Sequence, residues 1–232
     1  MKVSKKRLVS KLRAHGVNYR LVPGWDSAVI DPFKGKSDFK GIVLHHTAGV
    51  NSLNYIVNTN PFKPVRACHF LVQRNGVVQV VSGVGAYHAG SGGPYRFSKT
   101  VNIDKDAGNS QLYGIEIESL GTSAKIDRSL DGMSVEQVVS TGLLCASLLN
   151  AMRPTWKFLP VSRVIRHRDW SSRKIDVLQD LQWWHQVIGI ARRNRKDSVK
   201  AEREIRAFVK ANPNGRIKTG SFTEKQRESV IS

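Results

Sequence analysis

The sequence predicts an α/β protein in which a mixed central β-sheet is flanked by helices. Buried-strand patterns at Gly41–His46 and Gly114–Glu118 are interleaved with longer helical patterns, which is typical of α/β folds. Asn75-Gly76 separates two further short strand patterns and is a strong hairpin signal, so at least one pair of strands must be antiparallel. The sheet is therefore expected to be mixed.

The amino-terminal part of the 232-residue chain is strongly basic. Residues 1–20 hold seven Lys/Arg and no acid, and Leu8 and Leu12 stand at helical spacing. These features predict a short basic helix, with Gly16 at the position of a helix C-cap. Residues 21–40 contain two prolines and two glycines and predict an irregular lead-in.

The strands follow in order along the core. After Gly41–His46, a second strand is expected at about 68–73, with a return strand at 77–81 after the Asn-Gly turn. Residues 82–111 are rich in Gly, Ser and Asn and predict a long functional loop rather than core. The strand at 114–118 comes next.

The predicted helices of the core are marked by their ends. Ser134 with Gln137 three residues later forms a capping-box pattern, and a buried stripe then continues until a stop before Pro154. A short strand is expected at 163–166 and another helix at about 177–192.

The composition divides the chain into three parts. We expect a basic N-terminal helix at 1–20, a main domain at 21–192 and a basic tail at 193–232. From Arg192 to the end there are twelve Lys/Arg against five acids. Ile205, Phe208 and Val209 give a thin apolar stripe that predicts a short helix in this tail, and the last stretch is expected to be flexible.

The charge and the cysteine count limit the class of protein. The formal net charge of +19 favours a polyanion: nucleic acid, a membrane surface or an anionic cell wall. Specific nucleic-acid binding is not expected, because most aromatic residues stand in core-like positions rather than among exposed basic ones. Two cysteines exclude a disulfide framework and a four-cysteine zinc site. The N-terminus lacks the apolar region and cleavage site of a signal peptide, so no Sec export is expected.

Histidines and one aspartate form a candidate metal site. His45 and His46 end a strand, where successive side chains face opposite sides, so only one of them can face a given pocket. His167 and Asp176, nine residues apart, could supply two more ligands. Three protein ligands with a water molecule are typical of catalytic zinc. Alternatively, one histidine of the pair is in the core, Asp176 caps the following helix and Lys174 is solvated.

The strand at 114–118 carries a candidate general base. Glu116 and Glu118 alternate with Ile115 and Ile117, so the two carboxylates share one face while the isoleucines pack in the core. A carboxylate beside a metal can act as a general base towards water. The alternative is an ordinary amphipathic strand with one wet face.

Six motifs in order resemble those of the type 2 N-acetylmuramoyl-L-alanine amidases, a family that includes phage endolysins and relatives of the peptidoglycan recognition proteins. The resemblance covers roughly residues 20–190. Its motifs are L-H-H-T-A-G (44–49), C-H-F (68–70), R-N-G (74–76), Y-H-A-G (87–90), G-I-E-I-E (114–118) and H-R-D-W…R-K-I-D (167–176). It implies a zinc-dependent hydrolase that cleaves the amide between N-acetylmuramic acid and L-alanine in peptidoglycan.

The resemblance also implies roles for individual residues. It makes His45, His167 and Asp176 the zinc ligands. Glu116 matches the catalytic glutamate, and Lys174 matches the lysine that steadies the oxyanion. It also implies four substrate-binding residues: His69, His88, His46 and Thr47. His69 and His88 would line the groove, while His46 would face away from the metal.

Two departures from the family pattern stand out. Many members have Pro-Gly in the loop and a spacing of ten from the histidine to the aspartate, whereas this chain has Ser171-Ser172 and a spacing of nine. Cys68 stands where some relatives have a catalytic tyrosine. The second departure indicates a site that uses Glu116.

The charge, the missing export signal and the resemblance together predict a phage or prophage endolysin. Such a protein would reside in the host cytoplasm and act on the wall after release by another protein. Its basic ends would be attracted to anionic wall polymers or to the membrane surface; the alternative is a solvated helix with a loose tail. A non-catalytic peptidoglycan-binding module and a cytoplasmic muropeptide-recycling amidase are the alternative functions.

Overall fold

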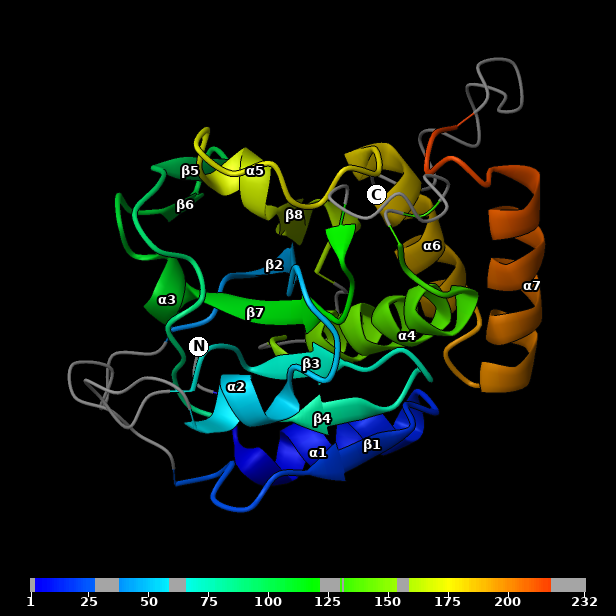
Figure 1. Ribbon diagram of the computed structural model, residues 1–232, viewed down its shortest axis with the longest axis horizontal. Helices are drawn as coiled ribbons and strands as arrows, with labels where there is room; N and C mark the ends of the chain where they lie inside the picture. The colour runs from blue at the N-terminus through cyan, green and yellow to red at the C-terminus, as the bar shows by residue number, and fades with distance from the viewer. Residues whose placement is uncertain are drawn as a thin grey trace.

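A mixed six-stranded sheet forms the centre of the molecule, as expected. The computed structural model describes residues 3–27, 38–58, 66–121, 130, 132–153 and 159–217 (Figure 1). The strands lie in the order β1-β4-β3-β7-β2-β8. Their bounds are Tyr19–Leu21 (β1), Gly41–His46 (β2), Phe70–Val72 (β3), Val78–Val80 (β4), Leu112–Ile117 (β7) and Val164–Arg166 (β8).

Parallel pairing dominates the half of the sheet that carries the histidines. β2 lies between β7 and β8 and is parallel to both, and β7 is also parallel to β3. The register places His45 beside Glu116 and Leu44 beside Arg166. Because parallel strands present their carboxyl ends at the same edge, the residues that follow β2, β7 and β8 meet there.

The predicted hairpin is confirmed. β3 and β4 are antiparallel, with Val72 opposite Val78. Gly76 has φ +81°, a conformation that L side chains rarely adopt, and the Asn75 side-chain oxygen accepts from the backbone N–H of Val77. The Asn-Gly pair therefore makes the turn for the reason read from the sequence.

Four helices make up the main helical layer. They are α1 (Lys5–Ala14), α4 (Val135–Ala151), α6 (Leu181–Arg193) and α7 (Ser198–Ala211). The capping box of α4 is confirmed: Ser134 accepts from Gln137 N, and the Gln137 side chain accepts from Ser134 N. α4 packs against α1, α6 and α7, and its buried residues join those of the sheet in one hydrophobic core.

The N-terminal helix is tied to the end of α4. Leu8 and Leu12 are buried, as the spacing predicted. Arg7 donates from Nε to the carbonyl of Ala151 and from Nη2 to that of Arg153. These carbonyls lie at the carboxyl terminus of α4, where backbone oxygens lack intrahelical partners and attract cations.

Three expectations need correction. Residues 82–111 are not a continuous loop, because they form a separate two-stranded sheet, β5 (Tyr95–Ser98) with β6 (Val101–Ile103), and the short helix α3 (Gly108–Gln111). The edge strand β1, Tyr19–Leu21, was not predicted; it lies where the basic segment 1–20 meets the lead-in, and residues 28–37 of the lead-in lie outside the described part. The helix expected from 177 begins only at Leu181. A short 3-10 helix, Val161–Arg163, also precedes β8.

The basic C-terminal segment includes a packed helix. Ala201, Ile205 and Val209 of α7 are buried, and the helix lies along α6 and α4 (Figure 1). Its cap residue Asp197 accepts from Lys200 N. The expected flexible end, residues 218–232, lies outside the described part, and the division into three parts stays a prediction.

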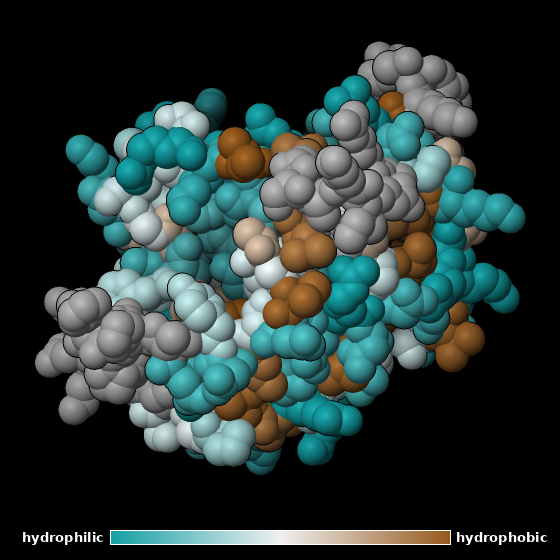
Figure 2. All heavy atoms as spheres, in the orientation of Figure 1, coloured by the Kyte–Doolittle hydropathy of each residue, from teal (hydrophilic) through white to brown (hydrophobic). Residues whose placement is uncertain are grey.

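The surface is mainly hydrophilic on the face seen in Figure 2, with apolar side chains in separate small groups. In the described part of the chain, no helix has the length and apolar character needed to cross a membrane.

Candidate metal centre

The histidines and the aspartate predicted as ligands converge at the carboxyl edge of the sheet. His45 lies near the end of β2, and His167 opens the short helix α5 (His167–Trp170) directly after β8. Asp176 Oδ2 lies 3.0 Å from His167 Nδ1 and 3.7 Å from His45 Nδ1. One donor atom from each of the three residues lies within 4.8 Å of the others.

This donor set fits a tetrahedral metal ion. Zinc–nitrogen and zinc–oxygen bonds of about 2.0–2.1 Å in tetrahedral geometry place neighbouring donor atoms about 3.3 Å apart. The distances from Asp176 Oδ2 to His167 Nδ1 (3.0 Å) and to His45 Nδ1 (3.7 Å) lie on either side of that value. Two imidazoles and one carboxylate also leave one tetrahedral position for water or substrate. The residues present therefore fit a catalytic rather than a structural metal site.

The nine-residue connection between His167 and Asp176 closes without the extra residue of many family members. Ser171 N donates to the carbonyl of His167, and Lys174 N donates to that of Ser171. Arg168 N then donates to the carbonyl of Asp176 at 2.8 Å. These turns return the chain to His167, which explains why the shorter loop still brings the carboxylate to the histidines.

Burial and hydrogen bonding prepare the groups for metal binding. Burial lowers the pKa of His45 to about 4, so its imidazole is neutral at physiological pH. Burial alone would raise the pKa of Asp176, but hydrogen bonds with His167 and His45 outweigh it and hold that pKa well below its usual range. A neutral imidazole and a carboxylate are the protonation states that metal ligation requires.

Glu116 lies next to His45 in the register and has an unsatisfied oxygen. Its Oε2 is buried and has no hydrogen-bond partner among the described residues. Burial, reinforced by the charge of Asp176, raises its pKa to about 8, while Lys174 acts in the opposite direction. A buried carboxyl group with a free oxygen and a pKa near neutrality can accept and return a proton.

Glu118, two residues further along the chain, has both carboxylate oxygens in hydrogen bonds with backbone N–H groups. Its Oε1 accepts from the backbone N–H of Ser52 at 2.7 Å, and its Oε2 faces Arg74 N at 3.4 Å. The two glutamates that alternate in the sequence therefore differ: Glu118 anchors two loops, and Glu116 stays available.

Lys174 is exposed at the rim of the site. Its positive charge lowers the pKa of both His45 and Glu116. The Asp176 side chain is 12% exposed, whereas that of His45 is 1% exposed.

His46 and Thr47 do not join the ligands. The His46 ring packs against Gly121, where a Cβ would lie 2.7 Å from its Cε1. Thr47 Oγ1 donates to the carbonyl of Gly49 and accepts from Ser119 N, so it holds the turn after β2. The expectation that His46 faces away from the metal agrees with this packing, while its contact with substrate, like that of Thr47, stays a prediction.

His69 and His88, expected to line the substrate groove, are both buried, and their contact with substrate stays a prediction. His69 is 0% exposed, and its Nδ1 accepts from Gly114 N. His88 Nδ1 lies 3.1 Å from His45 Nε2, and His88 Nε2 lies 3.1 Å from the carbonyl of Leu112. Burial lowers the pKa of His88 well below its usual value. Both rings lie behind the ligands, inside the protein.

Several residues around the histidines were not singled out from the sequence. The carbonyl of Ala89 faces His167 Nε2 at 3.3 Å and also accepts from Trp170 Nε1. Asn109 Oδ1 accepts from the backbone N–H groups of His88 and Ala89. Ala89 and Trp170 stand within the Y-H-A-G and H-R-D-W motifs, whereas the only signal for Asn109 was its place in the Gly-, Ser- and Asn-rich stretch.

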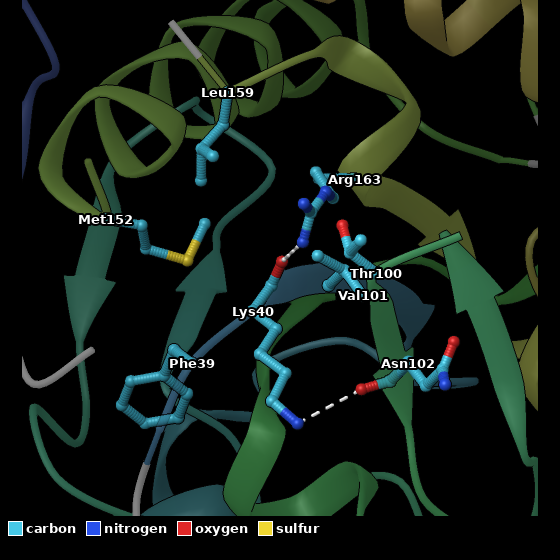
Figure 3. A pocket seen from close by; sticks show the side chains of 8 residues that line it. All are labelled: Phe39, Lys40, Thr100, Val101, Asn102, Met152, Leu159 and Arg163. Atoms are coloured by element: carbon cyan, nitrogen blue, oxygen red, sulfur yellow. Dashed lines mark hydrogen bonds between the residues drawn. The ribbon is translucent and has the colours of Figure 1, made fainter. Parts of the chain in front are cut away.

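Two pockets lie outside this site. One of about 220 Å³ lies at the amino end of β2, where Lys40 Nζ donates to the carbonyl of Asn102 and Arg163 donates to the carbonyl of Lys40 (Figure 3). The other, of about 570 Å³, is lined in part by Ser91–Pro94 and Trp170–Arg173. Neither is lined by His45, His167, Asp176 or Glu116.

The α/β sheet presents two histidines and an aspartate that could hold a metal ion, together with a buried carboxyl group, at its carboxyl edge, and this arrangement is typical of metal-dependent hydrolases. The chain belongs to the N-acetylmuramoyl-L-alanine amidase family, whose profile matches residues 35–177, more than half of its length. As a member it is an amidase that acts on peptidoglycan.

Two solved structures resemble the fold at low identity. PlyL is 18% identical, with 68% of this chain and 84% of that chain covered and a TM-score of 0.42. The PlyG catalytic domain is 15% identical, with 88% and 99% covered and a TM-score of 0.39. No curated protein matches the chain. The assignment therefore rests on the family match.

Proposed function

We propose that this chain is a zinc-dependent endolysin that degrades the bacterial cell wall by cleaving the amide between N-acetylmuramic acid and L-alanine. The observation that carries the proposal is the placement of His45, His167 and Asp176, with donor atoms within 4.8 Å of one another. Zinc is the metal proposed, because a mixed set of imidazole and carboxylate ligands with an open position is typical of catalytic zinc.

The residues around the ligands have distinct parts in the proposed reaction. Zinc, when bound, supplies Lewis-acid polarisation of the scissile carbonyl and lowers the pKa of water. Glu116 Oε2 takes the proton of the attacking water and returns it to the departing L-alanine nitrogen. Lys174 reaches the site from its open rim and stabilises negative charge on the former carbonyl oxygen.

A zinc assay combined with product analysis tests the enzymatic proposal. Purified protein should contain about one zinc per chain, and digested peptidoglycan should show free L-alanine amino groups with intact glycan strands by mass spectrometry. A metal-free protein that binds peptidoglycan without cleaving it would instead indicate a binding module. Cleaved glycan strands would contradict the proposed bond.

The lytic role is supported by charge. Of the 55 ionised side chains, 37 are basic, and an anionic wall polymer would attract them. A recycling amidase would instead prefer small soluble muropeptides.

Charge variants of α7 test the wall attraction without disturbing the core. Lys200, Arg203 and Lys210 are exposed on this helix, so replacing all three by glutamine should leave the fold intact. We expect weaker and less salt-sensitive binding to cell walls, with unchanged turnover of a small muropeptide. If the triple variant bound cell walls as well as the wild type, and wild-type binding did not depend on salt, the proposed targeting role would be removed. A strong preference of the enzyme for the small muropeptide over cell walls would favour the recycling function.

A further inference from the structure

We propose that His88 is a positioning residue that holds the proton of His45 on Nε2 and thereby keeps Nδ1 free to bind the metal. The proposal rests on the proposed metal-binding role of His45. It gives a function to the Y-H-A-G motif at 87–90 that differs from contact with substrate.

The hydrogen-bond chain can be followed from its far end. His88 Nε2 lies 3.1 Å from the carbonyl oxygen of Leu112, and a carbonyl can only accept, so this nitrogen carries a proton. His88 is buried and contacts no carboxylate in the described part of the chain, which favours its neutral form with a single N–H. Its Nδ1 is therefore an acceptor.

The acceptor on His88 determines the tautomer of His45. His45 Nε2 lies 3.1 Å from His88 Nδ1 and must donate to it. The second nitrogen of the neutral His45 ring is then free of a proton, and it is this Nδ1 that lies 3.7 Å from Asp176 Oδ2. Without His88, the His45 proton could move to Nδ1, where the Asp176 carboxylate would accept it and compete with the metal.

The neighbouring residue contacts the second histidine. The carbonyl of Ala89 lies 3.3 Å from His167 Nε2, and Asp176 Oδ2 lies 3.0 Å from His167 Nδ1. Both ring nitrogens of His167 therefore face acceptor oxygens, and the Ala89 contact alone does not fix its tautomer. The positioning role of His88 concerns His45. Outer partners of this kind set ligand tautomers, and their loss typically weakens metal binding about 10–100-fold.

The segment is held rigidly enough for this task. Asn109 Oδ1 accepts from both His88 N at 2.9 Å and Ala89 N at 2.8 Å. The His88 ring lies directly over Gly114 of β7, where a Cβ would come within 2.3 Å of its Cγ. The absence of a side chain at Gly114 therefore provides the space for the ring.

Two variants of His88 and one control test the proposal. His88→Phe keeps a ring of similar size but no hydrogen bond, and it should raise the zinc Kd about 10–100-fold in a chelator competition assay. His88→Asn restores an acceptor near the position of Nδ1 and should recover part of the affinity. The control His15→Phe removes another buried histidine, one that bonds to Asn150 between α1 and α4, and should leave the zinc Kd unchanged.

Nitrogen-15 chemical shifts of metal-free protein provide a readout independent of zinc and of activity. Wild-type His45 should be in the Nε2–H tautomer, and His88→Phe should move the proton towards Nδ1. Wild-type His45 protonated on Nδ1, or a folded His88→Phe variant with wild-type zinc affinity, would overturn the proposal. If the wild type bound no zinc, the proposed function would fail, whereas the tautomer measurement would still decide the role of His88.

Discussion

The two ends of β2 both gather charged and polar groups, yet they use them differently. At the amino end, Lys40 and Arg163 donate to backbone carbonyls and so fasten β6 and the start of β8 to the strand (Figure 3). At the carboxyl end, Glu116 keeps a buried oxygen without a partner in the described structure, and the Nδ1 atoms of His45 and His167 face Asp176. Satisfied polar groups stabilise the fold, whereas the unsatisfied ones mark the place where chemistry can occur.

The largest expected effect comes from Glu116→Gln. The amide keeps the shape of the side chain but cannot take a proton, so turnover of peptidoglycan should fall about 10²–10⁴-fold while zinc stays bound. Steady-state kinetics and metal analysis measure the two properties. The matched control is Glu118→Gln, which should lower the free energy of unfolding by about 1–3 kcal/mol because Glu118 anchors Ser52 N, with turnover close to that of the wild type. Normal wall lysis by Glu116→Gln would contradict the assignment.

Gly114→Ala should have a smaller effect, also at the carboxyl end of β2. The added methyl group would push against the His88 ring, so the zinc Kd should rise about tenfold, with a loss of about 1–3 kcal/mol in stability. Gly142→Ala in α4 is the control, because its Cβ would meet Val187 Cγ1 at 2.8 Å, in the packing of α4 against α6 rather than against His88. Chelator competition should separate the two variants. Equal zinc affinity in both would show that the ring tolerates the displacement.

Lys174→Met should shift the pH dependence of the reaction. The base must be ionised, so the rate rises with pH through the pKa of Glu116, and Lys174 lowers that pKa. Removing the positive charge raises the pKa, so the rising limb should move to higher pH. The shift should shrink with added salt, since Lys174 is exposed. Lys200→Met on α7 serves as the control, and a move of the limb to lower pH would refute the proposed coupling.

The smallest effect is expected at the amino end of β2. Lys40→Met removes donations to the Asn102 carbonyl and the Gln111 side chain, and it should cost about 1 kcal/mol in denaturant-induced unfolding. Zinc content and turnover should not change. A marked loss of turnover would show that the amino end of β2 affects the reaction at its carboxyl end, and would contradict a purely structural role for Lys40.

Local patterns in the sequence were sufficient for most of the elements. Period-two and buried-run patterns predicted β2, β3, β4 and β7, because strand character depends on neighbours one or two residues away. The Asn75-Gly76 turn and the Ser134 capping box were also predicted correctly, since each is a short-range device. The loop assigned to 82–111 was wrong, because the short strands β5 and β6 depend on pairing with each other rather than on a strong local pattern.

The sequence by itself determined the kinds of residues in the site and, through the order of the motifs, the family. His45, His167, Asp176 and Glu116 were all named from it. Only the tertiary structure decided how these groups meet, because β2, β7 and β8 become neighbours through long crossover connections. It also decided that the His88 ring contacts His45 Nε2, and that Glu118 is hydrogen-bonded while Glu116 Oε2 has no partner among the described residues. Periodicity gives the face on which a side chain lies, but its partners depend on which distant segments pack against that face.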